Sequence, residues 1–270
     1  MRLRSLMPVL AALSLTAQQR DLDRGVNFYS KEKEAALGKG LAADVLRQAT
    51  KLDNPEVQAY VERVGGRLTA HLPDTSLTFT FTVLSDNHGG PTHEPISLPG
   101  GYIFVSSSLI LAAQDEAEFA GMLAHAMIHV AARHGTREAT RGEIANMANI
   151  PLIYAGGWQI RDAAQVLVPV GFLKFQRANE LEADREAVPI LAASGYDPAA
   201  LLRYISRVQP EATGQAIVFS AMPARDERIA AIKKAIQKLD DFSRIQDAVR
   251  SAMPKPAEQR PPTLKRPDER

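Results

Sequence analysis

Apolar residues recur at intervals of three and four along much of the chain, a spacing that is typical of amphipathic helices. In residues 32–50 the repeated positions include Leu37, Leu41 and Val45, and the pattern returns in residues 54–72. The sequence therefore predicts two helices, which we expect to pack against each other in antiparallel orientation.

A different periodicity follows these helices. Residues 77–84 read LTFTFTVL, which alternates between apolar and polar positions and is rich in Phe, Thr and Val. This pattern predicts a half-buried strand. A segment with several glycines and prolines leads to a second short strand over Tyr102 to Val105, and we expect the two strands to pair in a small sheet. The predicted fold is α+β and mainly helical.

The next helix carries candidate chemistry. Asp115 and Glu118 have the spacing of a helix-capping box, and a basic turn followed by Gly135 is typical of a helix end. His125 and His129 lie between these limits, four residues apart, so both imidazoles face the same side and can reach one ion. An isolated pair with this spacing is also compatible with two ordinary helix histidines.

A second predicted helix strengthens the metal interpretation. Glu180 and Asp184 are also four residues apart. One carboxylate can complete a His-His-Glu zinc site, and the other can accept the N–H of a ligating imidazole and fix its tautomer. Glu182 is an alternative ligand to Glu180, and taken alone the segment could be a solvated charged face.

The composition restricts the remaining function classes. The chain has 270 residues, no cysteine and a formal net charge of +1. The absence of cysteine excludes disulfides, thiolate metal sites and a cysteine nucleophile. The balanced charge gives no support for nucleic-acid binding, which needs a clustered excess of basic residues. The length allows one large domain or two small ones.

Both ends differ from the central part of the chain. Arg2 and Arg4 precede an apolar run, so residues 1–17 are predicted to be a secretory signal peptide, with an uncleaved anchor as the alternative. Residues 251–270 contain five prolines and a single leucine, which predicts a disordered tail. The sequence thus predicts an exported protein, periplasmic or secreted, with one domain over residues 26–245.

Several segments resemble a family of zinc metallopeptidases. They are LPGGYIFVSSSLI (98–110), DEAEFAGMLAH (115–125), HVAARHG (129–135), NELEADREA (179–187), GYDP (195–198) and ERI (227–229). Their order and spacing are similar to those of the family that includes the CaaX prenyl protease, HtpX and BepA-like periplasmic chaperone-proteases. The resemblance extends from about residue 30 to residue 238.

The resemblance implies a gluzincin-like fold with a small sheet beside the active-site helix. It implies one zinc ion bound by His125, His129 and Glu180, with Asp184 in contact with a ligand. It also implies that the strand at residues 102–105 lies near the substrate-binding edge, and the residues expected there are Gly101, Tyr102, Ile103 and Phe104.

The chain departs from the family pattern at three positions. The family motif is H-E-x-x-H, but Ala126 replaces the glutamate that serves as general base. Ile128 stands where a glycine is usual, and Met222 stands where many members have a histidine before the ERI segment. An engineered inactivation would explain only the first change, so natural divergence is favoured.

The missing base decides how active the protein can be. General-base catalysis is worth roughly 10²–10⁴-fold. Glu138, Glu182 and His134 are candidate substitutes by their closeness in sequence, although His134 is expected to point away from the ligand face because it is five residues past His129. Two functions follow: a weakened zinc endopeptidase of exported or misfolded polypeptides, or an inactive zinc-binding chaperone or adaptor.

Two further alternatives stay open. A protein without metal would require the spacing of the two histidines to be coincidental. The apolar residues 150–175 could form a membrane hairpin, but polar residues interrupt them, which favours a buried helix or a lid. A peripheral membrane contact is compatible with the sequence, and the pattern indicates no oligomeric state.

Overall fold

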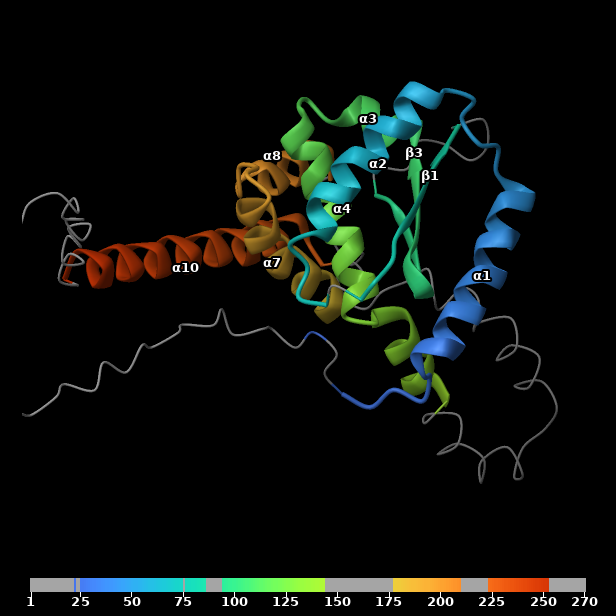
Figure 1. Ribbon diagram of the computed structural model, residues 1–270, viewed down its shortest axis with the longest axis horizontal. Coiled ribbons are helices and arrows are strands. Elements are labelled where there is room, and N and C mark those ends of the chain that lie inside the picture. Colours follow the sequence, from blue (N-terminus) through green and yellow to red (C-terminus); the bar gives the residue numbers. More distant parts are fainter. Residues whose placement is uncertain are drawn as a thin grey trace, which may run out of the picture.

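The computed structural model describes residues 25–74, 76–85, 94–143, 177–209 and 223–252, together with Leu22. The elements in chain order are α1 (Lys31–Gln48), α2 (Pro55–Thr69), β1 (Thr80–Leu84), β2 (Ile96–Leu98), the 3₁₀ turn η1 (Pro99–Gly101), β3 (Tyr102–Ser106), α3 (Ser107–Ala112), α4 (Glu116–Ala131), α7 (Arg177–Ala193), α8 (Ala200–Val208) and α10 (Arg225–Ala252). Residues 134–143 are also helical. The expected mainly helical α+β class is confirmed (Figure 1).

The three described strands form one small sheet in the order β1-β3-β2. β1 runs parallel to β3, with Phe81 opposite Ile103, and β2 runs antiparallel to β3, with Ser97 opposite the same Ile103. The expected pairing of the first and second predicted strands is therefore confirmed. β3 is the central strand, so its backbone is paired on both sides.

The two N-terminal helices cover different faces of the sheet. Successive strand residues point to opposite faces. Ile103 of β3 joins the large core beneath α2 and α4, whereas Phe104 joins a smaller cluster with Ala42 of α1. The expectation that α1 and α2 pack as an antiparallel pair is wrong, because each helix buries its apolar stripe against the sheet.

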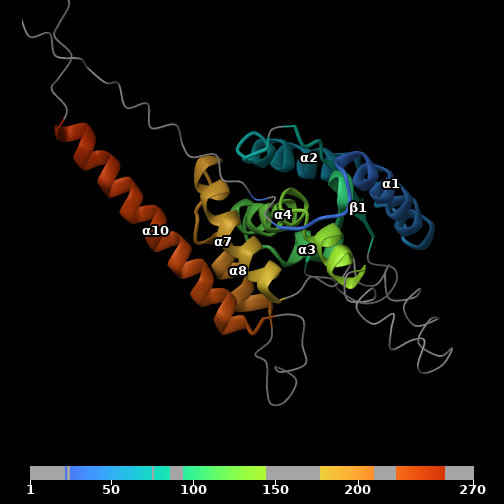
Figure 2. The same cartoon turned by 90° about the horizontal axis from the view of Figure 1, so that it is seen from below.

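The other helices form layers beside the sheet. α7 and α8 both pack against α4 on one side and against α10 on the other, as Figure 2 shows. α4 and α8 approach closely at Gly121, where an added Cβ would lie 3.0 Å from the Cα of Leu201. α4 is therefore enclosed between the sheet and the C-terminal helices.

The turn between β2 and β3 requires glycine at two positions. Gly100 and Gly101 have φ angles of 76° and 93°, which is the left-handed region that L side chains rarely adopt. A Cβ at Gly101 would also lie 2.0 Å from the carbonyl oxygen of Thr78. This close approach positions β3 next to the segment that leads into β1.

Some predicted features lie outside the described residues. These are the signal peptide over residues 1–17, the apolar stretch 150–175 and Met222. Residues 253–270 of the predicted tail lie outside them as well, while α10 continues to Ala252. Among the described helices, none is long and apolar enough to cross a membrane.

Candidate metal site

The helix that carries both histidines is buried along almost its whole length. α4 begins after Asp115, whose side chain accepts a hydrogen bond from the backbone N–H of Glu118 at 2.8 Å. Every residue from Glu118 to Ala131 is buried. A helix that is apolar on all sides is typical of a protein core, so any polar side chain on it needs a specific partner.

The two histidines meet a glutamate from α7. His125 Nε2 and His129 Nε2 lie 3.0 Å apart. Glu180 Oε2 lies 3.3 Å from the first nitrogen, and Glu180 Oε1 lies 3.5 Å from the second. The three side chains are buried, and one donor atom from each lies within 4.8 Å of the others. The i,i+4 spacing predicted this convergence from two helices.

The donor set fits a cation. Two imidazole nitrogens and a carboxylate oxygen are the ligand types of catalytic zinc sites, which use three protein ligands. Glu180 Oε2 is buried and has no hydrogen-bond partner among the described residues. Buried polar atoms are nearly always satisfied, and a cation held by the three donors would satisfy this oxygen.

Asp184 and Arg228 support the first histidine. Asp184 Oδ1 lies 2.9 Å from His125 Nδ1. Both side chains are buried, and the contact is an ion pair when His125 is protonated. Arg228 in turn hydrogen-bonds Asp184. The expected contact of Asp184 with a candidate metal ligand, His125, is present, whereas the contact of Arg228 with Asp184 was not foreseen from the ERI segment.

Electrostatics favour positive charge where the donors meet. Burial alone would lower the pKa of His125, but Asp184 and Glu180 outweigh burial and raise this pKa to about 9. Burial lowers the pKa of His129 to about 4, so that ring is neutral. Burial would raise the pKa of Glu180, but both imidazoles hold it far below its usual range. A cation held by the three donors would supply the positive charge that this cluster favours.

His134 lies beside the site, contrary to expectation. Its Nδ1 is 2.9 Å from the Nδ1 of His129. The prediction assumed one continuous helix, but α4 ends at Ala131 and Arg133 adopts a left-handed φ of 55°. Gly135 was expected to follow the helix end, yet it lies inside the next helical segment, residues 134–143. The turn at Arg133 directs His134 back toward His129.

The carboxylates that could replace the missing base already have partners. Glu182 Oε2 lies 3.3 Å from His134 Nε2, and this contact is the main reason that its pKa is lowered. Glu138 accepts a hydrogen bond from Asn179 at 3.3 Å and pairs with Arg141. A general base works best with a pKa near the operating pH, so the lowered pKa makes Glu182 a poor substitute.

The remaining site positions are placed as follows. Ala126 and Ile128 are buried on α4. Tyr102, Ile103 and Phe104 belong to the central strand β3 and are not themselves at an edge of the sheet. The strand beside them, β2, is an edge strand among the described strands.

The β2 edge lies next to the metal-site helix. A small cavity is bounded by Ser97 and Leu98 of β2 and by His129 of α4, with Glu34 and Arg133 among its other neighbours. β2 therefore brings a backbone edge close to one of the three candidate ligands.

Comparison with known proteins agrees with this geometry. The family model of peptidase family M48 matches residues 51–236, which include the three donors, Ala126 and Arg228. The chain belongs to peptidase family M48. M48 peptidases are zinc metallopeptidases, and His125, His129 and Glu180 form a candidate metal site of that kind.

Individual M48 relatives are similar over the same region. A putative beta-barrel assembly-enhancing protease of Vibrio cholerae is 31% identical over 170 residues, 59% of this chain and 34% of the relative. The beta-barrel assembly-enhancing protease of Escherichia coli K12 is 23% identical over 67% of this chain and 38% of the relative. The mitochondrial metalloendopeptidase OMA1 of Schizosaccharomyces pombe is 29% identical over 65% of this chain and 52% of its own length. The chain thus spans about a third to a half of these relatives.

Proposed function

We propose that this M48 protein binds one zinc ion and acts on exported or misfolded polypeptides, with peptide hydrolysis weakened by the loss of the general base. The observation that carries the proposal is the buried cluster of two imidazole nitrogens and a carboxylate within 4.8 Å of one another. Glu180 Oε2, which is buried and has no hydrogen-bond partner among the described residues, supports a cation at that point.

Each residue of the cluster has a defined task in this proposal. The zinc ion would be held by His125, His129 and Glu180. Asp184 would keep the His125 ring in the orientation that presents its Nε2 to the ion. Zinc supplies Lewis-acid chemistry that polarises a peptide carbonyl and activates water. Arg228 keeps Asp184 ionised and in place.

The proposed weakness follows from position 126. The H-E-x-x-H motif places its glutamate next to the first histidine, and Ala126 has no group that can accept a proton. Glu182, Glu138 and His134 are poor replacements, because each already contacts a neighbouring side chain. Loss of general-base catalysis costs roughly 10²–10⁴-fold in rate.

A polypeptide would bind in extended form along β2. Peptides commonly add a strand to an exposed sheet edge, where backbone hydrogen bonds provide affinity with little sequence dependence. Of the residues named from the family resemblance, Tyr102, Ile103 and Phe104 would support this edge from the neighbouring strand β3. Gly101 lies in the η1 turn just before that strand. Because β2 lies beside His129, an added strand would pass close to the metal.

A second candidate function is an inactive zinc-binding peptidase that holds polypeptides as a chaperone or adaptor. The combination of Ala126 with the engaged state of Glu182 and Glu138 favours it. Both candidates use the same β2 edge and the same ion, and they differ only in whether the bound polypeptide is cut.

Export is part of the proposal. The basic start and apolar run in residues 1–17 are typical of a signal peptide. The bacterial relatives are named for assembly of beta-barrel proteins, so unfolded exported polypeptides are the proposed substrates or clients.

The test is metal analysis of the purified full chain, followed by digestion of unfolded casein with and without a chelator. About one zinc per chain and slow, chelator-sensitive cleavage would support a weakened peptidase. Zinc binding with casein binding but without cleavage would support the inactive form. A chain that binds no zinc at neutral pH would contradict both.

A further inference from the structure

Two further side chains, His134 and Glu182, extend in series from His129, the second of the two candidate histidine ligands. His129 Nδ1 lies 2.9 Å from His134 Nδ1, and His134 Nε2 lies 3.3 Å from Glu182 Oε2. His129 and His134 are both buried, and Glu182 is only partly exposed. The two rings meet edge to face, with centroids 4.9 Å apart. The contacts therefore connect the metal-site helix to a carboxylate on α7.

The backbone around Arg133 creates this arrangement. On an uninterrupted helix, five residues correspond to a rotation of about 140° from His129, which would place His134 on another face. Arg133 instead has a φ of 55°, a conformation that is unfavourable for a residue with a side chain. Its guanidinium is held by Glu34 Oε2 at 2.8 Å and by the carbonyl of Tyr29. These contacts with distant residues hold the turn in its unfavourable conformation. Strained residues held in this way are common at functional sites.

Only one arrangement of protons allows His129 to bind a metal through Nε2. A ligating nitrogen must present its lone pair, so the ring proton of neutral His129 must be on Nδ1. His129 Nδ1–H then donates to His134 Nδ1, which places the His134 proton on Nε2, where it points to Glu182 Oε2. Each nitrogen of the two rings then has a partner. The negative charge of Glu182 lies at the end of the series farthest from the cation.

We propose that His134 and Glu182 are positioning residues that fix the tautomer and the ring orientation of His129 for zinc binding. The inference rests on the proposed zinc site. Metal-ligating histidines normally donate their second N–H to an acceptor, and loss of that acceptor typically lowers metal affinity about 10–100-fold. His125 has Asp184 for this purpose, and His134 backed by Glu182 does the same for His129.

The two supports differ in construction. Asp184 contacts its histidine directly and is neutralised by the buried Arg228. Glu182 acts through an intervening imidazole, and its side chain is 27% exposed. A direct role of His134 in proton transfer is disfavoured, because its Nδ1 faces the far side of His129 from the Nε2 that meets the other donors.

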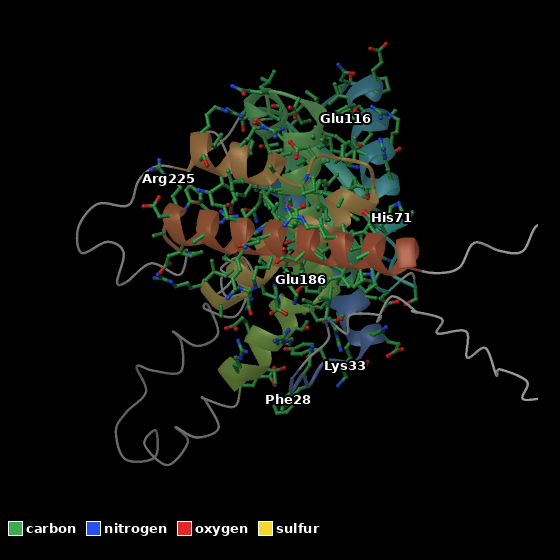
Figure 3. The ribbon with its side chains drawn as sticks, turned by 90° about the vertical axis from the view of Figure 1, so that its left-hand side faces the viewer. Phe28, Lys33, His71, Glu116, Glu186 and Arg225 are labelled. Atoms are coloured by element: carbon green, nitrogen blue, oxygen red, sulfur yellow. The ribbon has the colours of Figure 1, made fainter. Side chains whose placement is uncertain are left out.

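The test compares zinc affinities, measured by chelator competition, of the wild-type full chain and four variants. His134→Ala removes the acceptor and should weaken zinc binding about 10–100-fold. His134→Gln retains a side-chain oxygen that can accept from His129, so it should recover most of the affinity. Glu182→Gln keeps an acceptor for His134 but loses the charge, and it should have an intermediate effect. His71→Gln is the matched control, since His71, which is labelled in Figure 3, is exposed just after α2.

A second readout reports the tautomer itself. In the zinc-loaded wild type, nitrogen-15 NMR of labelled histidines should show His129 protonated at Nδ1 and unprotonated at Nε2. The His134→Gln variant should keep this pattern. If His134→Ala does not fold, the Glu182→Gln affinity and the wild-type spectrum still decide the inference.

The outcomes separate this inference from the proposed function. A wild-type chain that binds no zinc overturns the zinc site itself. A wild type that binds zinc with folded His134→Ala and Glu182→Gln variants as tight as His71→Gln overturns the positioning role alone. A His129 ring that is unprotonated at Nδ1 in the zinc-loaded protein also overturns it.

Discussion

Arg228 donates two hydrogen bonds to Asp184, from Nε to Oδ2 and from Nη2 to Oδ1, each at 2.8 Å. Both side chains are completely buried. Burial would raise the pKa of Asp184, but Arg228 holds it below its usual value, so the carboxylate stays ionised next to His125. The surroundings of one candidate metal ligand, His125, thus depend on an arginine from α10, the helix that lies farthest from the sheet in Figure 2.

Replacement of this arginine should destabilise the fold. Arg228→Met keeps a long side chain but removes the guanidinium that pairs with the buried Asp184, and breaking a buried pair costs about 3–5 kcal/mol. Urea unfolding of the metal-free protein measures the change. The control is Arg244→Met, because Arg244 is 81% exposed on the same helix, and a surface change of this kind should stay within about 0.5 kcal/mol. Equal stabilities of the two variants would contradict the structural role of the pair.

His129→Ala should abolish stoichiometric zinc binding. The variant leaves only His125 and Glu180, and two protein ligands do not form the three-ligand set of a catalytic zinc site. Atomic absorption of the dialysed protein should give about one zinc per chain in the wild type and a small fraction of that in the variant. His71→Ala, at an exposed histidine, should retain the wild-type content. Equal zinc in the wild type and His129→Ala would show that the metal lies elsewhere.

The core of the site could be predicted because it depends on local periodicity. The spacing of His125 and His129, and that of Glu180 and Asp184, fixes which side chains share a helix face. Alternation in residues 77–84 likewise predicted a strand, which is β1 over Thr80–Leu84. These predictions need only the helix or strand geometry and the assumption that apolar stripes are buried.

The features that could not be predicted depend on contacts between distant segments. His134 was placed wrongly because the left-handed turn at Arg133 is held by Glu34, about a hundred residues earlier in the chain. The position of the Arg228 side chain likewise depends on a partner on another helix, Asp184 of α7. The prediction that α1 and α2 pack against each other was wrong, because the spacing of their apolar residues does not show that a sheet lies between their apolar faces.

Stability at acid pH should depend partly on Asp74. Its carboxylate contacts Ser76 and Lys31, and these contacts lower its pKa from 3.8 to about 2. A depressed folded pKa contributes stability that is present above the unfolded pKa and is lost as the pH falls from about 4 to about 2. Because the side chain is 39% exposed, solvent screening limits the contribution to about 0.5–1 kcal/mol.

Asp74→Asn measures this contribution directly. The variant should be less stable than the wild type at pH 6, and the difference should shrink as the pH approaches 2. Urea unfolding at several pH values gives the comparison. Asp53→Asn, at an exposed position before α2, should show a smaller difference at pH 6. A difference between Asp74→Asn and the wild type that does not change with pH would contradict the assignment.

Ala126→Glu should raise peptidase activity by at least about tenfold, because it restores the general base that is normally worth 10²–10⁴-fold. Position 126 directly follows His125 on α4, so the new carboxylate belongs to the same H-E-x-x-H motif as the two histidines. Ala126→Gln is the matched control, because the side chain of glutamine has nearly the same size as that of glutamate but its amide is a very weak base. Digestion of unfolded casein, with zinc content measured in parallel, should show a gain for the Glu variant only.

If Ala126→Glu binds zinc, folds normally and cuts nothing, another lost group is required, and the double variant with Met222→His becomes the decisive comparison. If the wild type already cuts at rates typical of zinc endopeptidases, the claim of weakened hydrolysis fails and another base must act in the native chain.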